Sequence, residues 1–390
     1  MILLDRRAAM KLALGAAAGF AIRPMPALAE TGVDDKRILF GQAAALEGPA
    51  SALGTGMRTG ILAAFEEANR AGGVSGRKLD LVSVDDGYEP GKAIAATNRL
   101  IEDEKVFALI GAVGTPTSNA THPIAEAAGV PFIGPFTGAE SLRNPHKPNI
   151  VNVRASYFQE TEMMVERMTR DLGAKRIAIL YQDDAFGRAG LAGTRKAMDK
   201  REMALVAEGT FQRNTTAVKM ALIEIRRQEP DAVILIGPYR PCAEFIRVAR
   251  SIDFNPRFIN ISFVGSNALA KELGADGEGV YITQVVPFPG DASLPLVGRY
   301  HAALKAHEPG EQPGFVSLEG YIVGLLTVMA LEKVSGEPTR QAFLDAVKSG
   351  SFDLGGLTLS YGASDNQGSD DVFLTVINKS GGFDAVTAIG

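Results

Sequence analysis

The chain has 390 residues, of which 46% are hydrophobic and 22% are charged, and its net charge at pH 7 is −5. These values are typical of a globular protein long enough for two domains, and they exclude a disordered or low-complexity chain. The moderately acidic balance argues against nucleic-acid binding. Cys242 is the single cysteine, so no disulfide can form within one chain, and we interpret it as a small buried hydrophobic residue.

The first 29 residues differ in kind from the rest of the chain. A basic segment with the pair Arg6-Arg7 precedes a short apolar run, residues 12–22, and Ala27-Leu28-Ala29 then offers an A-x-A cleavage site. This pattern is typical of an export signal that is removed after Ala29. The paired arginines are similar to those of a twin-arginine signal, with Sec export as the alternative. Because the apolar run is too short to span a bilayer and no lipid-anchoring cysteine follows it, we expect a protein that is free in the periplasm.

From residue 37 onwards, short apolar runs alternate with helical patterns. The runs are nearly unbroken, as expected for strands of a parallel sheet that is buried on both faces. Strand and helix alternating at this spacing predict right-handed βαβ units. The first series comprises strands at residues 37–42, 79–84, 107–111, 130–134 and 149–154, with helices at 57–70 and 93–104.

A second series of the same period begins after a polar crossover, residues 155–157. One sheet of about ten or more strands is uncommon, so we expect two sheets in two lobes, with a crossing near Arg154. The second series comprises strands at residues 176–181, 204–209, 232–236 and 257–261, with helices at 160–172, 188–200, 216–228 and 243–252.

The last third of the chain predicts two further crossings. A strand at residues 279–285 runs into the rigid, extended segment Val286-Pro287-Phe288-Pro289. Two late strands, at 358–361 and 372–378, are predicted to close the chain as a hairpin-like pair. Because the chain would cross between the lobes three times, we expect a hinge rather than a free linker.

Three helices are predicted between these last strands, at residues 293–307, 314–334 and 339–348. The second is apolar enough over 314–330 to raise the alternative of a membrane span. Glu319 and several glycines interrupt that run, so we favour a buried helix.

These patterns assign residues 37–154 plus 286–355 to the first lobe and residues 156–284 plus 357–390 to the second.

Polar side chains follow two neighbouring strands of the first predicted sheet. Thr115, Thr117 and Ser118 come after the strand at 107–111, and Thr137 comes after the strand at 130–134. Ligands of open parallel sheets bind beyond the carboxyl ends of the strands, where loops offer hydroxyls and free backbone N–H groups. The sequence therefore predicts half of a small-molecule site here, without a reactive group.

Catalytic and cofactor motifs are imperfect or missing. Residues 54–60 have one residue too many between glycines for a dinucleotide fingerprint, and residues 87–93 are one residue too short for a P-loop. The four histidines show no metal-ligand spacing, and no G-x-S-x-G motif occurs. We therefore predict no catalytic residue, no cofactor and no metal. An exported hydrolase is the alternative from another class.

Several segments, in chain order, resemble the type I periplasmic binding proteins of ABC importers, in the branched-chain amino acid (Leu/Ile/Val) binding protein family. They cover nearly all of the chain after the signal. The resemblance implies two Rossmann-like α/β lobes with parallel sheets, joined by a three-strand hinge that closes on a ligand. The segments are LEGP (46–49), NRAGGVSGR (69–77), VDD (84–86), IG (110–111), GVP (129–131), RIAIL (176–180) and EGV (278–280).

The resemblance also implies partners and a function. The protein would capture a small carboxylate-bearing ligand, either an amino acid or an aromatic or aliphatic organic acid, and deliver it to an ABC permease and ATPase complex at the inner membrane. A monomer is expected. The alternative is a periplasmic sensor of the same fold that presents its ligand to a membrane receptor.

In this family the ligand carboxylate lies on the loops after the third and fourth strands, and the second lobe closes over it. Carried over to this chain, the pattern places the first loop at Val113-Gly114-Thr115 and the second at Phe136-Thr137-Gly138. The predicted ligand-binding residues are Val113, Gly114, Thr115, Phe136, Thr137, Gly138, Ser156, Asp184, Phe186, Tyr239 and Ser262.

The chain departs from the amino-acid binders at three positions. Ser262 stands where the family has the acidic residue that binds the ligand ammonium group, and Leu53 and Phe186 stand at tyrosine positions. An ammonium group would then lack its buried partner unless Asp184 or Asp183 replaces it. A carboxylate ligand without an α-amino group is therefore a second candidate beside an amino acid. Phe136, Phe186, Tyr239 and Phe263 would suit its apolar part, although Phe136 and Phe263 are equally well explained as core residues.

Overall fold

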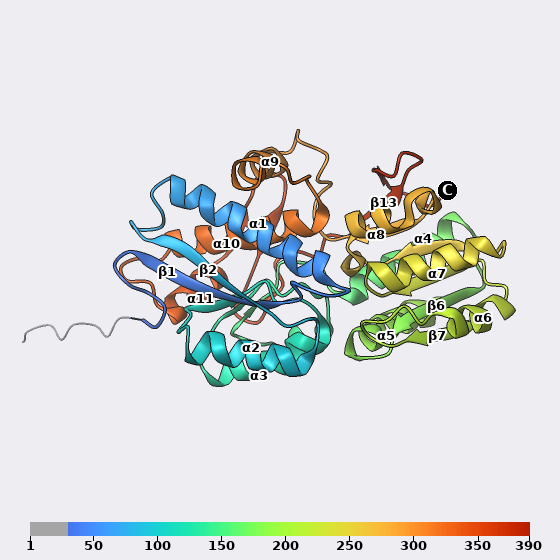
Figure 1. Ribbon diagram of the computed structural model, residues 1–390, viewed down its shortest axis with the longest axis horizontal. Helices are drawn as coiled ribbons and strands as arrows, with labels where there is room; N and C mark the ends of the chain where they lie inside the picture. The colour runs from blue at the N-terminus through green and yellow to red at the C-terminus, as the bar shows by residue number, and fades with distance from the viewer. Residues whose placement is uncertain (1–29) are drawn as a thin grey trace, which may run out of the picture.

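The computed structural model describes residues 30–390, so the predicted export signal and its cleavage site lie outside the described residues. Figure 1 shows two lobes side by side along the long axis of the molecule. Each lobe is a sheet with helices packed on it, which confirms the predicted two-lobed α/β fold.

The first lobe has a five-stranded sheet in the order β2-β1-β3-β4-β5, and every neighbouring pair is parallel. In Figure 1, α1, α9 and α10 lie above this sheet, and α2 and α3 lie below it. The elements are β1 (Arg37–Ala44), α1 (Ser51–Arg70), β2 (Lys78–Asp85), α2 (Pro90–Glu102), β3 (Ala108–Ile110), α3 (Thr115–Ala127), β4 (Phe132–Ile133), β5 (Ile150–Val151), α9 (Pro295–His307), α10 (Phe315–Glu332) and α11 (Arg340–Lys348).

Helix α10 is long and apolar enough to cross a membrane, but 83% of its apolar window is buried inside the protein. It packs against α1, and two glycines let the backbones approach closely. A Cβ on Gly60 would lie 2.0 Å from the Ser317 carbonyl oxygen, and a Cβ on Gly320 would lie 2.4 Å from the Met57 carbonyl oxygen. The predicted buried helix is therefore confirmed, and one glycine of each helix, Gly60 of α1 and Gly320 of α10, allows the close packing.

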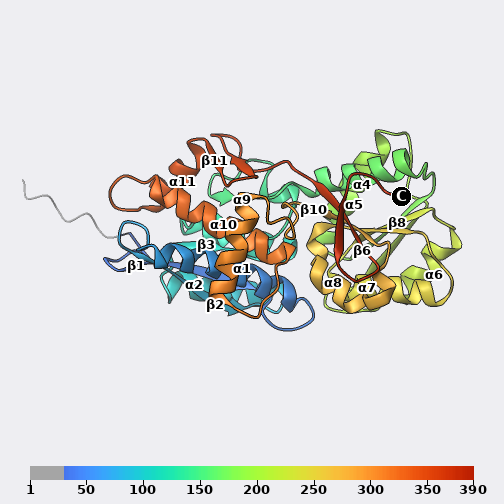
Figure 2. The same cartoon turned by 90° about the horizontal axis from the view of Figure 1, so that it is seen from above.

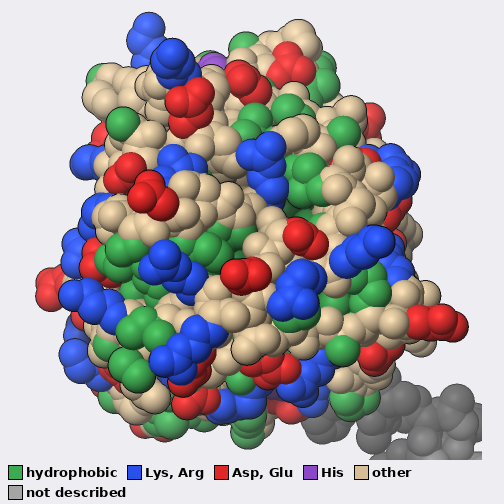
Figure 3. Space-filling model, turned by 90° about the vertical axis from the view of Figure 1, so that its right-hand side faces the viewer, with side chains coloured by type: hydrophobic (Ala, Val, Ile, Leu, Met, Phe, Trp, Pro, Cys, Tyr) green, Lys and Arg blue, Asp and Glu red, His purple; other side chains and the backbone are tan. Residues whose placement is uncertain are grey.

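The second lobe has a seven-stranded sheet in the order β14-β13-β10-β9-β8-β6-β7. The strands from β6 to β10 are parallel, whereas β13 and β14 are antiparallel at one edge. On the face in Figure 3, basic and acidic side chains are interspersed. The elements are α4 (Tyr157–Asp171), β6 (Ile177–Gln182), α5 (Ala185–Asp199), β7 (Ala207–Phe211), α6 (Lys219–Arg227), β8 (Ala232–Ile236), α7 (Tyr239–Ser251), β9 (Arg257–Asn260), α8 (Ser266–Leu273), β10 (Tyr281–Gln284), β13 (Phe373–Ile377) and β14 (Phe383–Val386).

The prediction that the two late strands pair with each other is wrong. Strand β12 (Thr358–Ser360) pairs with β11 (Ser351–Asp353), whereas β13 pairs with β10 and β14. The chain between β12 and β13 is instead a crossing segment, visible in red in Figure 2. It leaves no tight turn that could hold the two strands together. The predicted lobe ranges placed β12 in the second lobe, whereas its strand partner is β11.

Backbone hydrogen bonds join two of the crossing segments. The Asn152 amide donates to the Asn366 carbonyl at 2.8 Å, and the Gly368 amide donates to the Asn152 carbonyl at 2.8 Å. The Tyr361 hydroxyl donates to the same Asn152 carbonyl at 3.0 Å. The crossings between β5 and α4 and between β12 and β13 therefore form one ribbon between the lobes.

Candidate functional site

The loops after β3 and β4 lie side by side, as their positions in the sequence predict. Val113 and Phe136 form a parallel bridge, and the Thr115 and Thr137 hydroxyl oxygens are 2.7 Å apart. Gly114 connects the first loop to α3 with a φ of +96°. A Cβ at this position would lie 2.2 Å from the Tyr88 ring, so only glycine fits.

Helix α3 begins at Thr115, and Pro116 in its first turn has no N–H group, so the first turn offers the amides of Thr115 and Thr117. The Thr117 hydroxyl donates back to the Gly114 carbonyl at 3.0 Å. The Ser118 hydroxyl is buried and has no hydrogen-bond partner within residues 30–390. Free amide donors and the positive end of the helix dipole favour an anion at such a terminus.

Five aromatic side chains from both lobes meet in front of these loops, and we call them the aromatic cluster. Phe263, from the 3₁₀ turn after β9, lies at its centre. Its ring centroid is 4.4 Å from that of Phe186, 5.4 Å from that of Phe136 and 6.0 Å from that of Tyr88. All members are fully or almost fully buried, so the lobes are closed on each other here. The members are Tyr88, Phe136, Tyr157, Phe186 and Phe263.

Arg154, at the crossing between the lobes, lies on this cluster. Its guanidinium carbon is 4.5 Å from the Phe136 ring centroid, and the side chain is only 1% exposed. Its Nε lies 3.1 Å from Glu319 Oε1, without hydrogen-bond alignment, and one terminal nitrogen donates to the Ser262 hydroxyl at 2.7 Å. The other terminal nitrogen is buried and has no partner within the described chain.

Arg154 belongs to a group of four buried charged side chains, which we call the inner charge cluster. Its members are Arg143, Arg154, Glu160 and Glu319. Glu160 accepts from the Ser262 amide and hydroxyl at 3.0 and 2.9 Å and from the Thr283 hydroxyl at 2.6 Å. Burial raises the pKa of the Glu319 carboxyl to about 7, although Arg154 opposes the shift.

Arg143 joins the binding loop to the crossing segment. Its guanidinium donates to the carbonyls of Ala139 and Arg154, each at 3.0 Å, and to Gln367 Oε1 at 2.6 Å. Burial lowers the pKa of Arg143 to about 10, so it stays charged at neutral pH. The geometry of the loop after β4 is thereby tied to the hinge.

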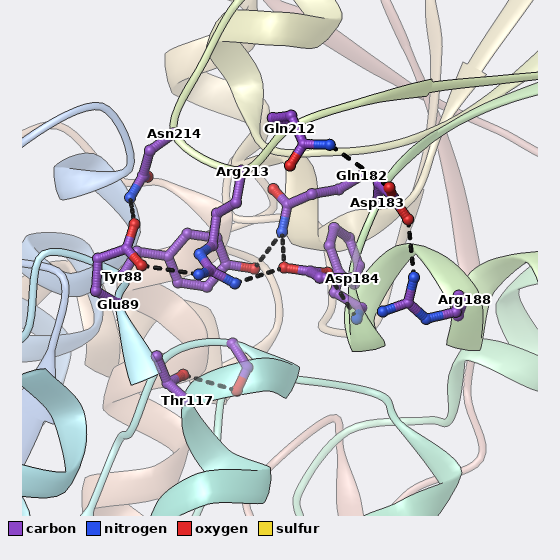
Figure 4. A network of polar contacts seen from close by, with 12 residues as sticks. Tyr88, Glu89, Thr117, Gln182, Asp183, Asp184, Arg188, Gln212, Arg213 and Asn214 are labelled. Atoms are coloured by element: carbon purple, nitrogen blue, oxygen red, sulfur yellow. Dashed lines mark hydrogen bonds and ion pairs between the residues drawn. The ribbon is translucent and has the colours of Figure 1, made fainter. Parts of the chain in front are cut away.

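A second group of charges, the outer ion-pair cluster (Glu89, Asp184 and Arg213), bridges the lobes, as Figure 4 shows. Arg213 donates to Asp184 in its own lobe at 3.0 Å and to Glu89 of the first lobe at 2.8 Å. Asn214 also donates to Glu89, at 2.7 Å. Gln182 donates to Asp184 at 2.7 Å and to the Tyr88 hydroxyl at 3.2 Å, which connects this cluster to the aromatic rings.

The structure does not support Asp184 or Asp183 as the replacement partner for an ammonium group. The Asp184 carboxylate is paired with Arg213, and it caps α5 by accepting from the Phe186 amide at 2.9 Å. Asp183 is paired with Arg188 at 2.8 Å, on the exposed side. A carboxylate that already has a cationic partner has little to offer a second one.

Three other predicted residues have partners of their own. Ser156 caps α4 in a reciprocal pair with Gln159. The Tyr239 hydroxyl accepts from the Ala52 amide across the lobes at 3.4 Å. Ser262 lies between Arg154 and Glu160. Of the predicted set, Thr115 and Thr137 meet on the two loops, and Phe136 and Phe186 lie in the aromatic cluster.

Sequence reasoning missed the residue with the most unusual setting, Arg154. The signal for it was present, because a cation ends the strand pattern Asn-Ile-Val-Asn-Val-Arg at residues 149–154. Tyr88 and Tyr157 were also missed. Phe263, for which the sequence leaves a ligand contact and a core position equally open, contacts aromatic rings of both lobes. Within residues 30–390, no group of three or more His, Cys, Asp or Glu side chains could hold a metal ion.

Comparisons with known proteins agree with this architecture. A family model described as "Periplasmic binding protein" matches residues 37–382. The Leu/Ile/Val-binding protein homolog 7 of Brucella abortus (strain 2308) is 24% identical over 349 residues, which is 86% of each chain.

Two solved structures share the fold. A "possible leucine/isoleucine/valine-binding protein" from Rhodopirellula baltica SH 1 is 39% identical, with a TM-score of 0.87 over 92% of this chain and 98% of that one. A fatty acid ABC transporter substrate-binding protein from Thermomonospora curvata is 22% identical, with a TM-score of 0.83 over 92% and 93% of the two chains. The resemblance stated from the sequence is thus confirmed.

Proposed function

Because the chain belongs to the periplasmic binding protein family, we propose that it captures a small carboxylate-bearing ligand between its lobes and delivers that ligand to an ABC permease. The family implies an extracytoplasmic location, and its members are substrate-binding proteins rather than enzymes. We propose further that the export signal is cleaved after Ala29 and that the mature protein acts in the periplasm. The name of one solved structure of the same fold, an ABC transporter substrate-binding protein, favours transport over the sensor alternative.

The start of α3 carries the proposal. Its first turn offers the Thr115 and Thr117 amides and the buried Ser118 hydroxyl. The Thr115 and Thr137 hydroxyl oxygens are 2.7 Å apart, and Phe136 of the aromatic cluster stands on the neighbouring loop. Such a wall offers donors to a carboxylate and an apolar surface to the rest of a small molecule.

The fold by itself does not choose the ligand. It is shared by a protein described as a possible leucine/isoleucine/valine binder and by one described as a fatty acid binder. Both ligand types carry a carboxylate, and only the first also carries an ammonium group. The choice therefore depends on the side chains of this chain.

Native mass spectrometry of the protein purified from its own periplasm would test the proposal. We expect a bound small acid, and we expect small-angle scattering to show compaction when that acid is returned to the stripped protein. A stripped protein that neither binds nor compacts with any amino acid or organic acid would contradict the proposal. As a control, Arg99→Gln removes an exposed arginine of α2 that pairs with Glu104, and it should bind as the wild type does.

A further inference from the structure

We propose that Arg154 binds an anionic group of the ligand inside the closed cleft, and that the protein thereby selects organic acids without an ammonium group over α-amino acids. This inference rests on the proposed function, because it concerns the ligand of the same cleft. It assigns a role to a side chain at the crossing between the lobes.

The first argument is the position of the guanidinium. Its carbon lies over the Phe136 ring, 4.5 Å from the centroid, in a cation–π contact, and Phe136 in turn contacts Phe263 of the other lobe. Phe136 itself belongs to the loop after β4, where it bridges to Val113 of the neighbouring loop. The Tyr157 ring centroid is 5.4 Å from that of Phe186, and its hydroxyl is buried without a hydrogen-bond partner in the described chain. Arg154 therefore borders both the aromatic cluster and the predicted carboxylate loops.

The second argument is that Arg154 keeps unused donor capacity. Guanidinium groups offer five N–H donors. Among the described residues, the Arg154 guanidinium has one hydrogen bond, to Ser262, and one unaligned ion pair, to Glu319, while its remaining terminal nitrogen is unpartnered. A buried donor without a partner is costly, and a carboxylate that accepts from it would remove that cost.

The third argument is a comparison with Arg213, the other arginine near an aromatic ring of the cluster. Arg213 lies 6.0 Å from the Tyr88 ring, but Glu89 and Asp184 already neutralise it. Arg154 has one carboxylate partner, Glu319, in a pair without hydrogen-bond alignment, so of these two arginines it is the one that keeps donors for a ligand anion. An ammonium group at the same place would face a positive charge in a low-dielectric setting, which is strongly unfavourable.

Glu319 can take up a proton when a ligand anion pairs with Arg154, so that a single negative charge faces the guanidinium. When a ligand anion reaches Arg154, it competes with the Glu319 carboxylate for the same guanidinium. Glu160 and Arg143 also act on Glu319, the first raising and the second lowering its pKa, which lies at about 7. Protonation of Glu319 by one proton from solvent leaves one anion, the ligand, opposite Arg154. Affinity for the anion should therefore fall as pH rises above 7.

The test uses two series of three probes, each with an acid, its uncharged amide and the matching α-amino acid. The first series is 4-methylpentanoate, its amide and L-leucine. The second is 3-phenylpropanoate, its amide and L-phenylalanine. Isothermal titration at pH 6.5 and pH 8 compares the wild type with Arg154→Met/Glu319→Gln, which removes both charges of the pair, and with Glu319→Gln, which keeps the guanidinium. Arg99→Gln is the matched control, because it breaks an exposed arginine–glutamate pair of the same 3.1 Å length.

We expect the wild type to bind at least one acid about tenfold or more tightly than its amide and its amino acid, as is typical of a charge-assisted bond. The double variant should lose that preference and keep its affinity for the amide, while Glu319→Gln should keep the preference and lose its pH dependence. Tighter binding of the amino acids, or acid binding that the double variant leaves unchanged, would overturn the role of Arg154 but leave ligand capture intact. No binding of any probe by the wild type would count against both proposals.

Discussion

Both charge clusters join the two lobes, but they differ in burial. In the inner charge cluster, Arg154 and Glu319 are 1% and 2% exposed, whereas in the outer ion-pair cluster the Arg213 and Glu89 side chains are 22% and 41% exposed. Water screens the outer pairs, so each contributes little to stability. The inner charges have lost their water, and each depends on the others. The outer cluster is thus suited to adjust how readily the two lobes close. The inner cluster is suited to recognise the charge of a ligand.

The largest expected effect comes from breaking the inner pair on one side. Arg154→Met leaves Glu319 buried without its cation, and we expect a loss of about 3–5 kcal/mol in the free energy of unfolding at pH 8. Urea unfolding measures it. Arg154→Met/Glu319→Gln should recover most of the loss, because no unpaired charge remains. If the double variant is as unstable as the single one, packing of the Arg154 side chain rather than its charge accounts for the loss.

The second expected effect is a pH dependence of the free energy of unfolding that is caused by Glu319. Its folded pKa of about 7 lies above the unfolded value, so its contribution to stability is complete below about pH 4 and is lost as pH rises through 7. Glu319→Gln should therefore flatten the stability profile between pH 5 and 8 by about 3 kcal/mol. Urea unfolding of both proteins across this range measures it. An unchanged profile would show that the carboxyl stays ionised throughout.

The sequence could predict the frame of the site because its signals are local. Apolar runs that end in glycine, and the Thr and Ser residues after them, place the loops at Thr115 and Thr137. The role of Asp184 could not be read in this way, since Arg213 lies 29 residues away in the chain. The partners of Arg154 are farther still: Ser262 is 108 residues away. Such pairs form only when the two lobes fold and close. The hydrophobic periodicity of the sequence reports local structure, so it cannot predict which distant residues pair.

A third, smaller effect should appear where the outer ion-pair cluster meets the aromatic cluster. Gly114→Ala places a Cβ 2.2 Å from the Tyr88 ring, whose hydroxyl contacts Gln182 beside the outer cluster. We expect a loss of about 2 kcal/mol, from backbone strain and from displacement of that ring. Gly129→Ala is the control, because its φ is also positive, at +62°, but nothing lies within 4 Å of its Cβ. Equal losses in the two variants, measured by urea unfolding, would show that Tyr88 moves aside freely.

The smallest expected effect comes from the outer cluster. Arg213→Gln removes both ion pairs between Arg213 and its carboxylates, and we expect closure to weaken by about 1 kcal/mol or less at low salt. Ligand affinity would fall about fivefold for every ligand alike, since Arg213 does not distinguish acids from amides. The difference from wild type should shrink as salt is raised, because exposed charges are screened. Arg188→Gln, which breaks an exposed pair within one lobe, should leave affinity unchanged. Titration of one acid and its amide at two salt concentrations measures both variants. A selective loss of acid binding in Arg213→Gln would mean that the outer cluster, and not the inner one, recognises the charge.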